Sequence, residues 1–118
     1  MHYVDAFVVP VPKKKLGEYK QMAVKMSKLC RKYGALKYVE AVADDVQMGK
    51  VTSFPRSVKR KPSETVVFAY VVYKSRAHRD SVNAKVMKDP VCKDMCESPM
   101  PFDGMRMFWG GFKTIVEA

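Results

Sequence analysis

At 118 residues the chain is long enough for one domain, residues 1–118, and leaves little room for a second. Its content of 47% apolar and 11% aromatic residues excludes an intrinsically disordered chain, and a formal net charge of +10 makes it strongly basic. No apolar run approaches the roughly 18–20 residues that a membrane helix needs, so a membrane-spanning protein is excluded.

The first segment, Tyr3 to Val11, is rich in β-branched and aromatic residues and predicts a strand. No basic stretch precedes it and Asp5 interrupts its apolar residues, so a secretory signal is not expected. The three cysteines are an odd number without paired spacing, which is typical of reduced thiols. We therefore expect a soluble, cytoplasmic protein.

Apolar residues then recur in steps of three and four from Lys13 to Tyr33, which predicts an amphipathic helix that ends at Gly34. The alternation in Leu36 to Val42 predicts a second strand. The polar stretch from Asp44 to Pro62 is longer than most loops in compact domains. Because such stretches usually contain structure, we expect an extra β-ribbon over Lys50 to Val58.

The clearest strand of the chain is Thr65 to Tyr73, with only one residue that is neither β-branched nor aromatic. Ser75 is well placed to cap a second helix that runs to about Lys88. The residues of this helix that we expect to point inward are Ala77, Val82, Val86 and Met87.

The pair Asp89-Pro90 is typical of the start of a short helix, which we extend through Cys96. Asp103-Gly104 indicates a turn, and Met105 to Thr114 predicts a last strand. The order of elements matches an α+β, ferredoxin-like fold, a four-stranded antiparallel sheet with two helices on one face. In that fold the first and third strands are central, with the last strand beside the first and the second beside the third.

The third predicted strand is apolar on both faces, with two alternating sets of residues: Val66, Phe68, Tyr70 and Val72, and Val67, Ala69, Val71 and Tyr73. The last strand has a similar pattern. Two helices cover only one face of a sheet, and an uncovered apolar face of this size would be a sticky patch. We therefore expect a homodimer in which two sheets pair face to face about a two-fold axis.

A resemblance to a known family rests on six segments of the chain: residues 3–8, 34–40, 44–46, 49–54, 100–107 and 110–112. The fairly specific parts are Met-Pro-Phe-Asp-Gly at 100–104 and Gly-Gly-Phe at 110–112. Together these segments resemble the YbaA-like bacterial proteins, a family of unknown function. The resemblance covers nearly the whole chain and implies a dimeric α/β-barrel, in which two ferredoxin-like sheets pack into one barrel. It does not imply a function.

Two carboxylates interrupt strands in which they should face the core or the dimer interface, Asp5 and Glu40. A carboxylate in such a place is costly unless it is paired or protonated, so each is expected to have a partner or a chemical role. Arg106, which we expect in the last strand, is the candidate partner of Asp5, with Asp103 near it. These four residues are the candidate catalytic residues, and a structural ion pair is the favoured alternative.

Three functions stay open at this point. The first is a cavity for a small organic ligand, in a binding protein or a cofactor-independent enzyme of the kind that the barrel superfamily contains. The residues that we expect to line this cavity are Phe68, Tyr70, Phe108 and Trp109. The second is weak nucleic-acid binding, described below, and the third is a structural or partner-binding dimer without a pocket.

The second function is weak nucleic-acid binding by the basic residues Arg56, Lys59, Arg60 and Lys61. Phe54 is the only aromatic residue close to these basic residues in the sequence. Stacking on bases is therefore poorly supported, and nucleic acid is not the favoured partner. A basic, solvated surface is the plainer explanation of the charge. No cofactor motif is present, and His2 and His78 lack neighbouring ligands for a metal, so neither a metal nor a cofactor is expected.

Overall fold

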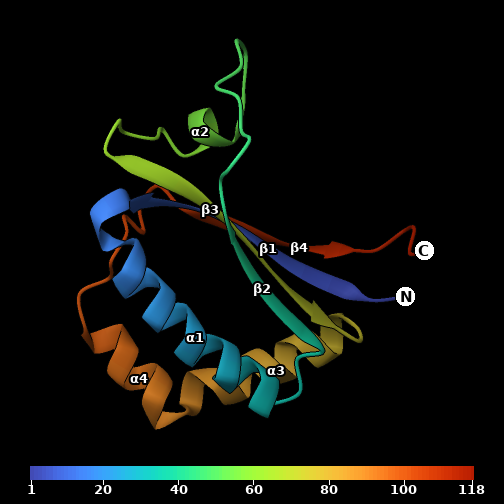
Figure 1. Ribbon diagram of the computed structural model, residues 1–118. Helices are drawn as coiled ribbons and strands as arrows, with labels where there is room; N and C mark the ends of the chain where they lie inside the picture. The colour runs from blue at the N-terminus through green and yellow to red at the C-terminus, as the bar shows by residue number, and fades with distance from the viewer.

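The computed structural model describes residues 1–118 and has one sheet of four antiparallel strands in the order β2-β3-β1-β4 (Figure 1). The strands are β1 (Tyr3–Pro12), β2 (Lys37–Val42), β3 (Glu64–Tyr73) and β4 (Phe108–Lys113). The ferredoxin-like prediction is confirmed in the number, direction and order of the strands. The sheet of the single chain is open, with β2 and β4 at its edges, and does not close into a barrel.

Three helices cover one face of this sheet (Figure 1): α1 (Leu16–Lys32), α3 (Arg76–Lys88) and α4 (Pro90–Glu97). A 3-10 turn over Lys13–Lys15 leads into α1. Ser75 accepts a hydrogen bond from the backbone N–H of His78, and Asp89 accepts one from that of Val91, so both predicted N-caps are confirmed. None of the helices is long and apolar enough to cross a membrane.

The core lies between the helices and the sheet, and every second residue of β1 and β3 points into it. The buried strand residues on this side include Val9, Val11, Val67, Val71 and Tyr73, and the helices contribute Tyr19, Leu29, Cys30, Val82 and Val86. Because strand side chains alternate, the other residues of β1 and β3 point to the opposite face.

The opposite face of the sheet is covered at one end only, where Val58 packs on Val8 and Val66. Elsewhere it exposes aromatic side chains: Phe68 is 38% exposed, Phe108 47% and Phe112 60%. The strand register places these three on that face, since Phe68 and Phe108 both lie opposite Val8, and Phe112 lies opposite Val4. We call this surface the open face.

The predicted β-ribbon over residues 50–58 is wrong. A short helix, α2 (Phe54–Ser57), occupies its second half, and the segment between β2 and α2 projects away from the sheet without strand pairing (Figure 1). Ser53 accepts a hydrogen bond from the backbone N–H of Arg56, and Pro55 stands in the first turn of the helix. Proline lacks the N–H that a strand ladder needs but fits a helix start, which explains the difference.

Two further expectations need correction. In α3, Ala77 and Met87 are exposed, and the residue that turns inward with Val82 and Val86 is Arg79. The last strand begins at Phe108 and not at Met105, because the carboxylate of Asp103 accepts a hydrogen bond from the backbone N–H of Met105 and extends the turn.

Candidate functional site

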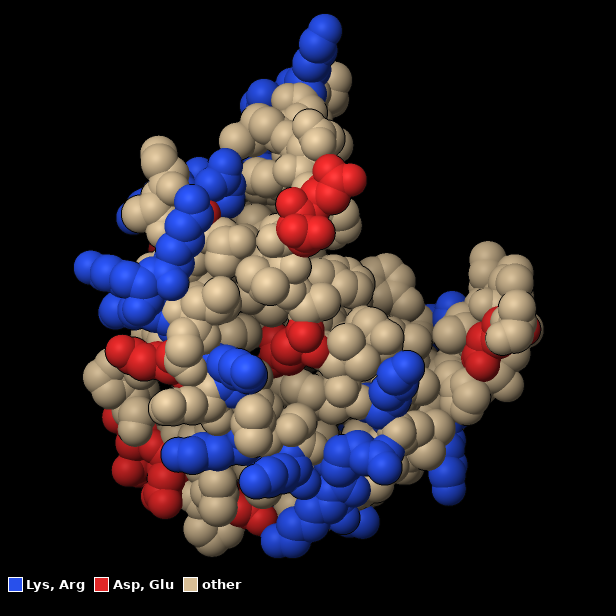
Figure 2. Space-filling view, in the orientation of Figure 1, with Lys and Arg blue, Asp and Glu red and all other residues tan.

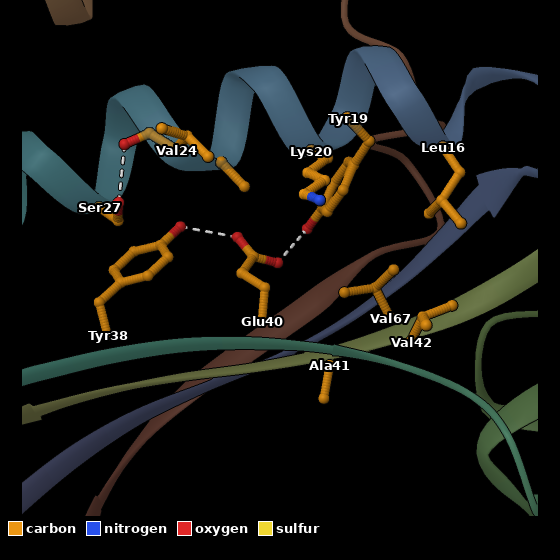
Figure 3. Close-up of a pocket in the computed structure, with 11 residues that line it drawn as sticks. Leu16, Tyr19, Lys20, Val24, Ser27, Tyr38, Glu40, Ala41, Val42 and Val67 are labelled. Atoms are coloured by element: carbon orange, nitrogen blue, oxygen red, sulfur yellow. Dashed lines mark hydrogen bonds between the residues drawn. The ribbon is translucent and has the colours of Figure 1, made fainter.

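A cleft of about 450 Å³ lies between α1 and the edge strand β2 (Figure 3). Its wall is largely apolar, and the lining residues include Leu16, Ala23, Val24, Ala41, Val42 and Val67. Its polar lining residues are Tyr19, Lys20, Ser27, Tyr38 and Glu40. A concave, mostly apolar site with a few converging polar groups is typical of small-molecule binding.

Glu40 lies at the centre of this cleft and is held by two phenol groups (Figure 3). The hydroxyl of Tyr19 donates to Oε1 at 2.6 Å, and the hydroxyl of Tyr38 donates to Oε2 at 2.7 Å. Burial, together with the hydrogen bond to the carboxylate and its charge, raises the pKa of both tyrosines. The two phenols therefore stay protonated and remain donors to Glu40.

The local sequence accounts for this geometry. Tyr38 and Glu40 are two residues apart on β2, so both side chains point to the helix side of the sheet. The residue opposite Glu40 on β3 is Ala69, and α1 contributes Ala23 to the cleft wall. The small side chain of Ala23 leaves room in the cleft that a larger residue would fill.

A second site contains Asp5, which is only 2% exposed on β1. Its Oδ1 accepts a hydrogen bond from Arg79 of α3 at 2.7 Å, and the guanidinium of Arg79 also lies over the ring of Tyr3. Burial raises the pKa of Asp5 in spite of the neighbouring Arg79 and a hydrogen bond with Asn83. Asp5 thus has a partner, but this partner is Arg79 and not Arg106.

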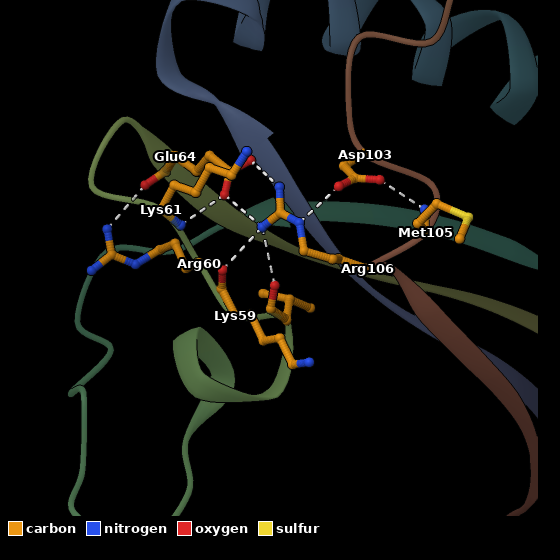
Figure 4. Close-up of polar contacts among 8 residues, drawn as sticks. Lys59, Arg60, Lys61, Glu64, Asp103, Met105 and Arg106 are labelled. Carbon is orange, nitrogen blue, oxygen red and sulfur yellow. Dashed lines mark hydrogen bonds and ion pairs between the residues drawn. The ribbon is translucent and has the colours of Figure 1, made fainter.

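Arg106 instead holds a cluster of polar contacts around the buried Glu64, at the start of β3 (Figure 4). Its guanidinium donates to both oxygens of Glu64, at 2.8 and 2.6 Å, and to Asp103 at 2.8 Å. It also donates to the backbone oxygens of Val58 and Lys59. These contacts join the loop before β4 to the segment after α2, a structural role, and the expectation that Asp103 lies near Arg106 is confirmed.

The four candidate catalytic residues therefore fall in three different places. Only Asp103 and Arg106 are together, while Asp5 lies under α3 and Glu40 lies in the cleft. Glu40 is the member of the set that faces a cavity. The residues that complete its site, Tyr19 and Tyr38, follow apolar patterns in the sequence, and the phenol groups gave no separate signal there.

The aromatic residues predicted to line a ligand cavity do not form one. Phe68, Tyr70 and Phe108 belong to the open face, whereas Trp109 points to the helix side, where its ring stacks on Phe7 and lies 5.9 Å from the guanidinium of Arg79. The strand alternation separates them, because Phe108 and Trp109 are neighbours in β4. The cavity of this protein lies instead beside β2.

The basic residues at 56–61 lie around α2 and the turn that follows it. Arg56 donates to the backbone oxygens of Met48 and Gly49, and Arg60 donates to that of Glu64. Two of the four side chains thus stabilise the loop structure around them. No group of three or more His, Cys, Asp or Glu side chains is arranged to hold a metal ion.

Comparisons with known proteins agree with this fold. A family model described as "Protein of unknown function (DUF1428)" matches residues 2–104. The chain is 49% identical over 117 residues to "Uncharacterized protein YbaA" of Escherichia coli K12, with 99% of each chain covered, and the protein of that name from Shigella flexneri gives the same values. Among solved structures, a dimeric ferredoxin-like protein from an uncultured marine organism matches with a TM-score of 0.61 and 13% identity over 100% of both chains. The chain belongs to the DUF1428 family.

Proposed function

We propose that this protein binds a small organic molecule in the cleft between α1 and β2. The observation that carries the proposal is Glu40, a carboxylate held by two phenol hydroxyls in a mostly apolar cleft. A volume of about 450 Å³ falls within the range of sites for small ligands. The apolar wall would take the body of the molecule, and Glu40 would accept a hydrogen bond from its polar group.

The cleft can be tested with N-phenyl-1-naphthylamine, an uncharged aromatic probe that carries an N–H donor. We expect NMR chemical-shift changes at the methyl groups of Val24, Val42 and Val67, all of which line the cleft. Val24 lies at an exposed position of α1, so Val24→Trp narrows the cleft without disturbing the core. This variant should weaken binding of the probe by roughly tenfold or more, because the bulky ring occupies the site.

The matched control is Gln21→Trp, an exposed position on the same helix that does not line the cleft. It should leave the affinity for the probe unchanged. Shift changes confined to residues of the open face, or equal affinity in Val24→Trp and the parent protein, would contradict the proposal.

A second proposal concerns assembly, and we infer that the chain acts as a homodimer. The exposed Phe68, Phe108 and Phe112 support it, because a contiguous apolar surface on a protein in water favours association. The solved structure with the same fold is described as dimeric, which also supports it. Pairing of two open faces would complete the barrel that a single chain leaves open.

Nucleic acid ranks below a small ligand as a partner. The guanidinium groups of Arg56 and Arg60 already bind backbone oxygens of the chain, which leaves fewer N–H donors for phosphates.

We also propose that the protein is located in the cytoplasm. Cys30 and Cys92 are buried free thiols, and free thiols are typical of a reducing compartment.

A further inference from the structure

The carboxylates of this chain that are buried or half-buried have cationic partners, with one exception. Asp5 pairs with Arg79, Glu64 and Asp103 pair with Arg106, and Asp89 pairs with Lys32. Glu40 has no Lys, Arg or His nitrogen within 4 Å, and its hydrogen bonds come from the neutral phenols of Tyr19 and Tyr38. The charge of Glu40 is therefore hydrogen-bonded but not neutralised.

From this difference we propose that the ligand of the cleft is an organic amine, bound as its ammonium ion on Glu40, with an apolar body. The inference rests on the proposed function of the cleft. Each oxygen of Glu40 receives one phenol hydroxyl and keeps a further lone pair for an ammonium N–H. Hydrogen bonds between charged groups are about twice as strong as neutral ones, and a cleft with an apolar wall strengthens them further.

The surroundings of Glu40 suit a cation in a second way. The phenols of Tyr19 and Tyr38 reach the carboxylate from two sides through their hydroxyl groups (Figure 3), and these neutral donors leave its negative charge for a cation. Figure 2 shows acidic atoms in the middle of this face of the molecule, beside one basic side chain and otherwise bordered by neutral surface. An amine that enters the cleft would therefore find the negative charge at its centre.

Lys20 borders the cleft and provides a test of the sign of the ligand charge. It is an exposed residue of α1 that lines the cleft, and no ion pair joins it to Glu40. For a cationic ligand, Lys20 is a repelling neighbour and a competitor for Glu40. For an anionic ligand it would be the binding group, so its removal has opposite effects in the two cases.

The experiment compares three ligands with one skeleton: 3-phenylpropylamine, 3-phenylpropan-1-ol and 3-phenylpropanoic acid. Their affinities are measured at neutral pH by NMR titration of the methyl groups that line the cleft. We expect the amine to bind roughly tenfold or more tightly than the alcohol, because only the amine adds an opposite charge to its hydrogen bond with Glu40. The acid should bind most weakly.

Two variants test which residues of the cleft cause the preference for the amine. Glu40→Gln keeps the shape of the side chain and should abolish the advantage of the amine while the alcohol still binds. Lys20→Met should strengthen binding of the amine by a few-fold, since it removes the like charge at the cleft. An NMR spectrum of each variant verifies that it is folded.

Equal affinity of amine and alcohol, or an amine advantage that survives in Glu40→Gln, overturns the amine inference while the cleft remains a ligand site. Tightest binding of the acid, lost in Lys20→Met, overturns it in favour of an anion site. If none of the three ligands binds and N-phenyl-1-naphthylamine also leaves the cleft methyl groups unshifted, the proposed function itself fails.

Discussion

Asp5 and Arg79 join the middle of the sheet to α3 through an ion pair that is almost fully buried. Removal from water disfavours the charged carboxylate and raises the pKa of Asp5, while Arg79 acts in the opposite direction. A group whose pKa is raised in the folded protein supports stability most at low pH, and this support is lost as the pH rises through the folded pKa. The stabilisation that Arg79 gives to the buried carboxylate of Asp5 is therefore most important at neutral pH.

We predict that Arg79→Leu lowers the free energy of unfolding by about 3–5 kcal/mol at pH 7, because it leaves an unpaired buried carboxylate. The loss should be smaller at acidic pH, where Asp5 of the variant takes up a proton, since its pKa rises further without the arginine. Urea unfolding curves at the two pH values measure both effects.

The double variant Asp5→Asn/Arg79→Leu should be more stable at pH 7 than Arg79→Leu alone, because the buried charge is gone. Arg76 is the matched control, since it is an exposed arginine on the same helix without an ion pair, and Arg76→Leu should change stability by under about 0.5 kcal/mol. A pH-independent loss in Arg79→Leu would show that the pair acts through packing alone.

At the scale of elements, the cluster around Arg106 fixes the segment that contains α2. Glu64 is 3% exposed at the start of β3 and accepts hydrogen bonds from Arg106 and from the backbone N–H of Lys61. The hydrogen bond from Arg106 is the main cause that lowers the pKa of Glu64 from its ordinary value of 4.5. A group with a lowered folded pKa supports stability above 4.5 and loses that support as the pH falls through the lowered value.

We predict that Arg106→Gln speeds amide hydrogen exchange of residues 54–64 by roughly tenfold or more, while β1 and the centre of β3 stay protected. The reason is that the guanidinium is the common partner of Glu64, Asp103 and two backbone oxygens in this region. Mass spectrometry of the exchanged protein measures it, with Arg76→Gln as the control. Uniform acceleration over the whole chain would instead indicate a loss of global stability.

The same two ion pairs show what could be predicted from the sequence. Both caps and the span of α1 follow from local patterns, and the strand order follows from the fold that the order of elements indicates. The structure confirms all of these predictions. The partners of Asp5 and Arg106 depend on which helix residue turns inward and where β4 begins, and no local pattern specifies either. The cleft was missed for a similar reason, since it forms between residues of α1 and β2 that are distant in sequence, such as Ala23 and Glu40.

At the scale of the molecule, the sheet has one covered and one open face, and this difference leads to a prediction about size in solution. We expect light scattering coupled to gel filtration to give twice the 13.5 kDa mass of the chain. Phe68→Glu should shift the protein toward the monomer, because it would bury a charge in the proposed interface. Phe68 is 38% exposed in the single chain, so the smaller Glu side chain can reach water there while the chain is a monomer.

Met87→Glu is the matched control for this prediction. Met87 is 70% exposed on α3, on the helix side of the sheet, so the same substitution there should leave the dimer intact. A mass of one chain for the parent protein at micromolar concentration, or dissociation of both variants to the same extent, would contradict pairing through the open face.

The cleft lies on the helix side of the sheet, and the open face lies on the other side. In a dimer joined through the open faces, the two cleft entrances would point outward, on opposite surfaces of the particle. Ligand could then enter and leave either subunit without any separation of the pair. Turnover of ligand and lifetime of the assembly would be kinetically independent, so a long-lived dimer could still exchange its ligand rapidly.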